Sequence, residues 1–246
     1  MPWLFYDCAL ASNSISIKVA FTRSFKSDMT QSAEHPKIVL ASTSPYRKQQ
    51  LEAWGLPFAT AEPKVNESQL KSELKGTTPQ EICQALAKAK AQSLAKQDPD
   101  LFVIGADQMA VTAEGEILEK PGDGERAVHQ LMKLSGHTHS LYTALAVVYE
   151  RQEFEHVEKV DITFRDLVEE EACAYVACDD PWDCTGAYKL EKRGICLVRQ
   201  ITGKDPSSIQ GLPLMALSEA FLELTGHLPF VYRHKLLQIG GRPSST

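Results

Sequence analysis

The chain has 246 residues, of which 43% are hydrophobic and 24% are charged, and its formal net charge is −6. This length and composition are typical of a globular protein with one large domain or two small ones. The acidic balance argues against a general nucleic-acid or anionic-membrane binder, and no apolar run reaches the ~20 residues that span a bilayer. The six cysteines are dispersed and form no CxxC pair. They argue against a zinc site or a disulfide framework and favour reduced thiols in a cytoplasm.

The first 33 residues differ from the rest of the chain. They are rich in serine, and Asp7 interrupts their first apolar stretch, which weakens a secretory signal; Asp7 and Asp28 both count against a transit peptide. We interpret residues 1–33 as a disordered extension or a misassigned start, since Met29 lies just upstream of the first clear strand. We expect one domain over residues 34–228 and a flexible basic tail over residues 229–246.

The first predicted elements are a strand over residues 37–41, a hydroxyl-rich turn and an amphipathic helix. Ser44 can cap this helix, and Pro45 fits its first position, where a backbone N–H group is not needed. Arg47 and Lys48 in the first turn oppose the helix dipole, so an anion is expected beside them. The sequence therefore predicts a phosphate site at this helix start.

The next stretch contains the strongest chemical candidate. A charged loop over residues 62–78 leads into the capping box Thr78-Pro79-Gln80-Glu81 and a helix with apolar residues at helical spacing. Residues 101–106 form an apolar run short enough for a buried strand, and Asp107 follows it directly. Ligands of open α/β sheets bind at that end of a strand. The Asp107 carboxylate could hold a metal or activate water, and the alternative is a helix or turn cap.

Further elements follow at regular intervals. In chain order we expect a hairpin over residues 109–118 that turns at Glu114-Gly115, a helix over 125–134, strands over 137–149 and around 160–164, a helix over 168–178, a strand over 194–201 and a last helix over 213–224. The mixture of strands, hairpins and helices predicts an α/β fold with a mixed sheet.

Other polar residues allow two interpretations. Lys120 follows the hairpin in Glu-Lys-Pro, and Lys90 lies on the polar face of a helix; each is either a ligand or a solvated lysine. His137 and His139 point to one side of a strand without a third metal ligand spaced to join them, so we expect a structural role. The chain has no GxxxxGK[ST], GxGxxG or GxSxG motif, which argues against P-loop, Rossmann and serine-hydrolase functions.

Seven short motifs occur in order between about residues 37 and 226, namely LASTSPYRK, VNE, AKAKA, GADQ, EKP, TGAYKLE and GLPL. Together they resemble the Maf family of nucleoside-triphosphate pyrophosphatases. The resemblance implies a Maf/ITPase-like mixed twisted sheet, flanked by helices, with an active-site cleft between two lobes. It also implies hydrolysis between the α- and β-phosphates to a nucleoside monophosphate and pyrophosphate, with Mg²⁺ or Mn²⁺ as the cofactor.

The resemblance assigns roles to individual residues. Five of them would hold the triphosphate: Ser44, Arg47, Lys48, Lys90 and Lys120. Glu67 and Asp107 would hold the metal, and Asp107 would also accept the proton of the attacking water. Lys189 is a further candidate for substrate contact. The family usually has an arginine where Lys48 stands, and lysine keeps the charge but loses the bidentate geometry.

Three positions bear on the base of the nucleotide. Tyr46, Gln108 and Glu191 resemble the 7-methyl-GTP pyrophosphatase branch, which has Trp, Gln and Glu there, whereas the dTTP/UTP branch has Arg, Thr and Gln. Methylation at N7 gives the purine a delocalised positive charge, which an aromatic face attracts and a carboxylate can pair. The alternatives are a dTTP/UTP pyrophosphatase and a non-catalytic nucleotide-binding regulator of cell division.

We therefore expect a cytoplasmic enzyme that clears modified nucleotides and binds a small nucleotide, with no nucleic-acid polymer or membrane as a partner. The resemblance also implies a homodimer, which no residue pattern in the chain requires.

Overall fold

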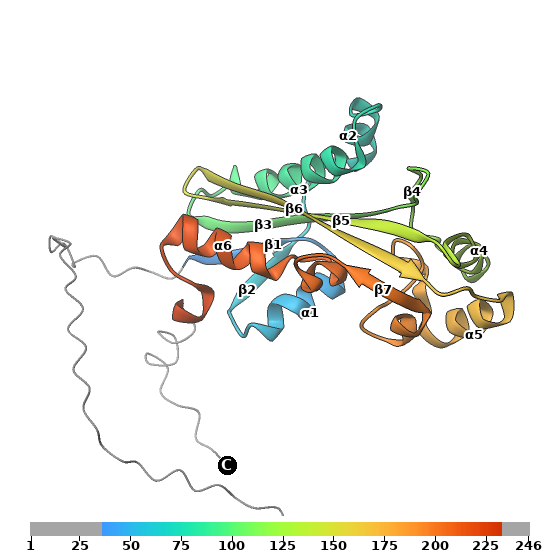
Figure 1. Ribbon diagram of the computed structural model, residues 1–246. Coiled ribbons are helices and arrows are strands. Elements are labelled where there is room, and N and C mark those ends of the chain that lie inside the picture. The colour runs from blue at the N-terminus through green and yellow to red at the C-terminus, as the bar shows by residue number, and fades with distance from the viewer. Residues whose placement is uncertain (1–35, 233–246) are drawn as a thin grey trace, which may run out of the picture. The chain divides into compact units, whose positions relative to one another are not determined.

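The computed structural model describes residues 36–232. In this part of the chain seven strands form one mixed sheet in the order β2-β1-β3-β5-β6-β7, with β4 beside β3 (Figure 1). The strands are β1 (Lys37–Ala41), β2 (Phe58–Ala61), β3 (Leu101–Val111), β4 (Ile117–Leu118), β5 (Thr138–Tyr149), β6 (Gln152–Phe164) and β7 (Val198–Thr202). Strand β1 is parallel to β2 and β3, and the other pairs are antiparallel. The expected α/β fold with a mixed sheet is confirmed.

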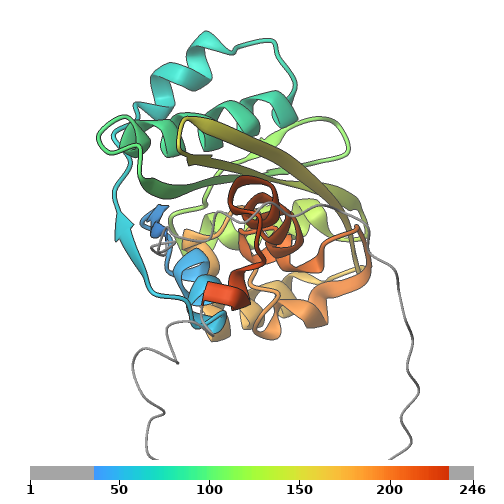
Figure 2. The same ribbon diagram turned by 90° about the vertical axis from the view of Figure 1, so that its left-hand side faces the viewer.

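Helices cover both faces of the twisted sheet (Figures 1 and 2). Helices α2 (Glu67–Glu73) and α3 (Pro79–Ala95) lie on one face, and α1 (Pro45–Ala53) and α6 (Leu214–Thr225) lie on the other. Helices α4 (Gly124–Leu134) and α5 (Glu169–Asp179) pack at the end of the sheet where β5 begins and β6 ends. Three short 3-10 segments are η1 (Pro181–Asp183), η2 (Arg193–Leu197) and η3 (Pro206–Gln210). No helix among the described residues is both long and apolar enough to cross a membrane.

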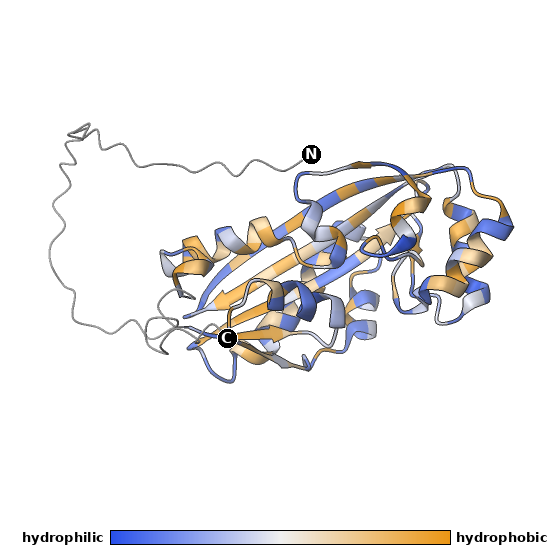
Figure 3. Cartoon of the chain, turned by 90° about the horizontal axis from the view of Figure 1, so that it is seen from below, coloured by the Kyte–Doolittle hydropathy of each residue, from blue (hydrophilic) through white to orange (hydrophobic). Residues whose placement is uncertain are grey.

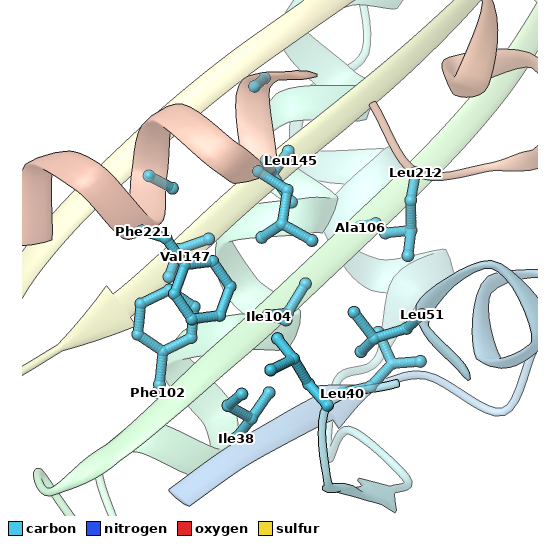
Figure 4. Packing of buried hydrophobic residues seen from close by; sticks show 14 of the residues in the cluster. Ile38, Leu40, Leu51, Phe102, Ile104, Ala106, Leu145, Val147, Leu212 and Phe221 are labelled. Carbon is cyan, nitrogen blue, oxygen red and sulfur yellow. The ribbon is translucent and has the colours of Figure 1, made fainter. Parts of the chain in front are cut away.

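Strand β3 has apolar residues on both faces because helices cover both of its sides. Phe102 and Ile104 pack toward α1 and α6, whereas Val103 packs toward α3. The ring of Phe102 stacks on Phe221 of α6 with 4.2 Å between the ring centroids (Figure 4). Hydrophobic residues are frequent along the central strands (Figure 3). A strand buried on both faces is expected to have a continuous apolar sequence, which explains the run at residues 101–106.

Gly105 allows helix α3 to approach β3 very closely. A Cβ atom at this position would lie 2.4 Å from the backbone oxygen of Ala87 and 2.6 Å from the backbone nitrogen of Ala91. Only glycine fits such a contact between a strand and a helix backbone. Lys90 lies one residue before Ala91 on α3, so this contact also fixes the height of Lys90 above the sheet.

Two expected elements differ in the structure. Strand β3 does not end before Asp107, because it continues to pair with β5 after β1 has ended opposite Gly105, and Asp107 lies opposite Ala144 within the ladder. The expected loop over residues 62–78 contains helix α2, whose N-cap Asn66 accepts a hydrogen bond from the Gln69 backbone N–H. The sequence signal for this helix was Asn66 itself, because asparagine is one of the residues that most often cap a helix start.

Smaller differences concern caps and boundaries. The capping box at Thr78 and Glu81 is present, but Ser44 occupies the N-cap of α1 without a side-chain capping hydrogen bond. The strand expected over residues 194–201 begins as the 3-10 segment η2. The expected extension over residues 1–33 lies outside the described residues, as does the expected tail after residue 232. Residues 229–232 of that tail are helical, and Tyr232 is buried beside Phe221.

Candidate active site

A pocket of about 710 Å³ lies where the turn after β1 faces the middle of β3. This volume is in the range of small-molecule sites. Nine of the eleven residues expected in the site line it: Ser44, Tyr46, Arg47, Glu67, Lys90, Asp107, Gln108, Lys120 and Glu191. Lys48 and Lys189 are not among the lining residues. The fold thus assembles residues from the first turn of α1, from α2, α3 and β3, and from two later loops.

At the floor of the pocket a buried ammonium group joins two carboxylates. The Nζ atom of Lys90 lies 2.7 Å from Oδ1 of Asp107 and 2.9 Å from Oε1 of Glu67. The side chains of Lys90 and Asp107 are buried, and that of Glu67 is half-exposed. A buried charge requires a partner, and here the cation holds both carboxylates in fixed positions. Lys90 is therefore a central residue of the site and not a solvated helix lysine.

Glu67 and Asp107 form a small oxygen-donor set. No group of three or more His, Cys, Asp or Glu side chains that could hold a metal occurs within residues 36–232. Mg²⁺ commonly binds through one or two carboxylates and completes its shell with water and substrate phosphates. The two carboxylates fit a hard cation of this kind, Mg²⁺ or Mn²⁺, provided that the substrate supplies the remaining oxygens.

The turn after β1 is organised by Ser42, which sequence reasoning missed. Its Oγ atom accepts hydrogen bonds from the Ser44 backbone N–H at 3.1 Å and from Nη1 of Arg47 at 3.3 Å. Nε of Arg47 donates to the backbone oxygen of Gly211 at 3.0 Å. Desolvation lowers the pKa of Arg47 from its usual value, although the charge of Asp107 opposes this shift. Arg47 is thus held against two loops as a fixed cation that lines the pocket.

Lys48 and Lys120 have different environments. Lys48 is half-exposed and forms an ion pair with Glu52, one turn later on α1, at 3.6 Å. Successive helical residues point about 100° apart, so the orientation that brings Arg47 to the pocket directs Lys48 away from it. The expected contact of Lys48 with phosphate does not fit this position. Lys120 is exposed and lines the pocket, as expected.

Tyr46 is held by two residues from another loop. Its hydroxyl donates to Oδ2 of Asp183 at 2.9 Å, and Nζ of Lys189 lies 3.1 Å from Oδ1 of the same carboxylate. Lys189 also donates to the backbone oxygen of Asp180 at 2.9 Å and lies 5.6 Å from the centroid of the Tyr46 ring. Lys189 therefore supports the tyrosine and does not itself reach the pocket.

The pKa values in this group follow from its contacts. Burial, with smaller effects from Cys184 and Asp183, raises the pKa of Tyr46 well above its usual value. Desolvation raises the pKa of Asp183, but the hydrogen bonds from Lys189 and Tyr46 outweigh it, so the pKa lies below its usual value. At neutral pH the tyrosine is a neutral donor and the aspartate a charged acceptor.

Gln108 and Glu191 complete the side of the pocket assigned to the base. The Nε2 atom of Gln108 lies within 3.1 Å of three acceptors: the Thr143 hydroxyl and the backbone oxygens of Ser208 and Ile209. Its amide nitrogen is therefore used to hold the loop that contains η3, while the residue still lines the pocket. Glu191 is exposed and lines the pocket.

The two histidines considered as metal ligands lie apart from this site. His139 is buried, and its Nε2 atom lies 2.8 Å from the hydroxyl of Tyr188, whereas His137 is exposed and contacts the Ser135 backbone oxygen. This arrangement agrees with the structural role that their spacing predicts.

Comparison with known proteins identifies the family. The Maf-like protein family model matches residues 37–224. The chain belongs to the Maf-like family. The Maf-like match runs from β1 into α6 and includes every residue that lines the pocket.

The match to curated relatives covers nearly the whole length of each relative. The 7-methyl-GTP pyrophosphatase of Hahella chejuensis is 40% identical over 191 residues, which are 77% of this chain and 94% of the relative. The protein of the same name from Aromatoleum aromaticum is 42% identical over 186 residues, 75% of this chain and 93% of the relative. The solved structure of the Staphylococcus aureus Ham1 protein matches with a TM-score of 0.42 and 16% identity, over 76% of this chain and 98% of that one.

Proposed function

We propose that this Maf-like protein is a nucleoside triphosphate pyrophosphatase that hydrolyses 7-methyl-GTP to 7-methyl-GMP and pyrophosphate. The buried Lys90, bonded to both Asp107 and Glu67 inside the pocket, is the observation that carries the proposal. The relatives from Hahella chejuensis and Aromatoleum aromaticum bear the name of this activity. Their names and the shared family support the same substrate here.

The chemistry needs charge neutralisation and positioning more than it needs a covalent intermediate. Lys90, Arg47 and Lys120 line the pocket as three cations that would bind the triphosphate oxygens. The Asp107 carboxylate would accept a proton from the attacking water. The water oxygen forms a new bond to the α-phosphorus, the anhydride bond between the α- and β-phosphates breaks, and pyrophosphate leaves.

A divalent metal supports this arrangement. Glu67 and Asp107 would hold Mg²⁺ or Mn²⁺, which supplies further neutralisation of the phosphate charge when it is bound. Lys90 keeps one oxygen of each carboxylate in place through its two ion pairs. The chain's own residues thus orient both carboxylates before any ligand arrives.

The base would be recognised by aromatic and acidic groups. The face of Tyr46 would stack on the methylated purine, whose delocalised positive charge favours an aromatic platform. Glu191 would pair with the N–H edge of the ring through charge-assisted hydrogen bonds. The substrate is a free nucleotide, and the five described cysteines are unpaired thiols, both of which fit the proposed cytoplasmic location.

The direct test is pyrophosphate release by the purified full-length chain. We expect the highest kcat/KM with 7-methyl-GTP, compared with GTP, dTTP and UTP, and loss of turnover when the divalent metal is chelated. Equal turnover of dTTP and 7-methyl-GTP would contradict the proposed base. No turnover with any nucleotide would instead indicate a nucleotide-binding regulator. Lys48→Met, which lies outside the pocket, is a control that keeps full activity.

A further inference from the structure

Asp183 connects two distant parts of the chain at the edge of the pocket. Each of its carboxylate oxygens has a different partner: Oδ2 accepts the hydrogen bond from the Tyr46 hydroxyl, and Oδ1 pairs with Lys189. Asp183 ends the short segment η1 and Tyr46 lies in the first turn of α1, 137 residues earlier. Both Tyr46 and Asp183 line the pocket. No motif in the sequence indicated that Asp183 belongs to the site.

The carboxylate of Asp183 also neutralises the charge of Lys189. The Lys189 ammonium is buried, with 7% of its side chain exposed, and lies 5.6 Å from the centroid of the Tyr46 ring. Tyr46 lines the pocket and Lys189 does not. An unpaired cation this close to the ring would repel a second cation stacked on it.

We propose that Asp183 is a positioning residue that fixes the Tyr46 ring and neutralises Lys189, so that the ring can stack on a positively charged base. This inference rests on the proposed function and deepens it by naming a residue that selects the substrate class. Asp183 and Lys189 cancel in charge, which leaves Glu191 to give this end of the pocket a net negative charge. A cationic purine matches that charge, and a neutral purine does not.

A purely structural tether is the competing explanation. Half of the Asp183 side chain is exposed, and the buried Lys189 ammonium keeps its hydrogen bond to the Asp180 backbone oxygen when Asp183 is replaced. Replacing Asp183 should therefore leave most of the folding stability intact. Selectivity between a cationic and a neutral base can then be measured in a folded protein.

The experiment compares the binding of 7-methyl-GMP and GMP to the full-length chain by calorimetry in the absence of metal. For Asp183→Asn we expect the preference for the methylated nucleotide to fall by about fivefold, the scale of one cation–π contact. Asp183→Glu should restore part of the preference. Asp166→Asn is the matched control, because Asp166 is another exposed aspartate in an ion pair, here with Arg199, and does not line the pocket. It should bind like the unmodified chain.

The same substitution in a Tyr46→Leu variant shows whether Asp183 acts through Tyr46. The quantity compared is the ratio of the affinities for 7-methyl-GMP and GMP. In Tyr46→Leu the ring is gone, so adding Asp183→Asn should lower the ratio less than it does in the unmodified chain, because only the repulsion from the unpaired Lys189 remains. An unchanged ratio in Asp183→Asn, or an equal loss in the Tyr46→Leu background, overturns the inference. Failure of the proposed function is distinct, because the unmodified chain would then show no preference for 7-methyl-GMP over GMP.

Discussion

Asp107 combines two properties that a general base needs. It is buried and held by Lys90 at 2.7 Å, and it lies inside the β3 ladder opposite Ala144, so its backbone position is rigid. We expect Asp107→Asn to lower kcat by about 10²- to 10⁴-fold, the usual contribution of acid–base catalysis, while Lys90 keeps its contact with Glu67. Steady-state kinetics with 7-methyl-GTP, together with thermal unfolding to verify the fold, measure this. A variant with more than a tenth of the original kcat would exclude Asp107 as the base.

Glu191 tests base recognition separately from the chemistry. The change Glu191→Gln keeps the size of the side chain and removes its charge. A charge-assisted hydrogen bond exceeds a neutral one by about 1 kcal/mol, so we expect roughly a fivefold loss in kcat/KM for 7-methyl-GTP. The loss for GTP should be smaller, because GTP has the same N–H edge but lacks the positive charge that Glu191 also attracts. Parallel pyrophosphate-release assays on both nucleotides measure the ratio. A ratio equal to that of the unmodified chain would remove Glu191 from the site.

Residue type and motif predicted most of the pocket, but side-chain direction did not follow from them. Arg47 and Lys48 are neighbours in one motif, yet the helix directs only Arg47 to the pocket. Lys189 lies in a motif of the family, yet it pairs with Asp183, which holds Tyr46, and does not line the pocket. Ser42 and Asp183 organise the site through hydrogen bonds to Arg47 and Tyr46. Such contacts join residues far apart in the chain or depend on turn geometry, and no local pattern encodes them.

At the level of elements, the contact between α3 and β3 positions Lys90 relative to Asp107. Lys90 belongs to α3 and Asp107 to β3, and the backbone contact at Gly105 sets the distance between the two elements. The sequence predicted both elements, because an apolar run and a capping box are local signals. The extension of β3 beyond Asp107 was not predicted, since it depends on pairing with β5, a strand that begins 27 residues after β3 ends.

Gly105→Ala is the test of this contact. The added Cβ would lie 2.4 Å from the Ala87 backbone oxygen, and a helix backbone cannot move away as a flexible side chain can. We expect a loss of about 1–3 kcal/mol in the free energy of unfolding, as for other overpacked cores, and a lower kcat because Lys90 shifts relative to Asp107. Urea unfolding and steady-state kinetics measure the two effects.

Gly124→Ala is the matched control for that substitution. Gly124 begins α4, and the nearest side-chain atom to an added Cβ would be 3.5 Å away, an ordinary contact. Alanine is also the better helix former, so stability should stay the same or rise. Equal destabilisation by both substitutions would mean that the close approach at Gly105 has no special importance.

For the molecule as a whole, the sequence predicted the class of fold but not the order of its strands. Alternation and apolar runs identify strands, whereas the order β2-β1-β3-β5-β6-β7 results from long-range pairing. The position of the loop over residues 205–212 also depends on contacts between distant parts of the chain and could not be predicted from local sequence. Buried Gln50 of α1 donates to the Ser207 backbone oxygen at 2.7 Å and accepts from the Leu212 N–H at 3.0 Å, across more than 150 residues of sequence. This closure holds Gly211 where its carbonyl oxygen meets Arg47.

Global stability should depend on pH through His139. Burial lowers the pKa of His139 from 6.5 to about 4, although the charge of Asp161 opposes the shift. The unfolded chain therefore binds a proton between these values that the folded chain does not, and stability falls as the pH drops from about 6.5 to about 4. The loss from this residue is on the order of 3 kcal/mol. Urea unfolding at several pH values measures it: His139→Gln should flatten the dependence in this window, and the exposed His137→Asn should not. The same slope in His139→Gln as in the unmodified chain would contradict this assignment.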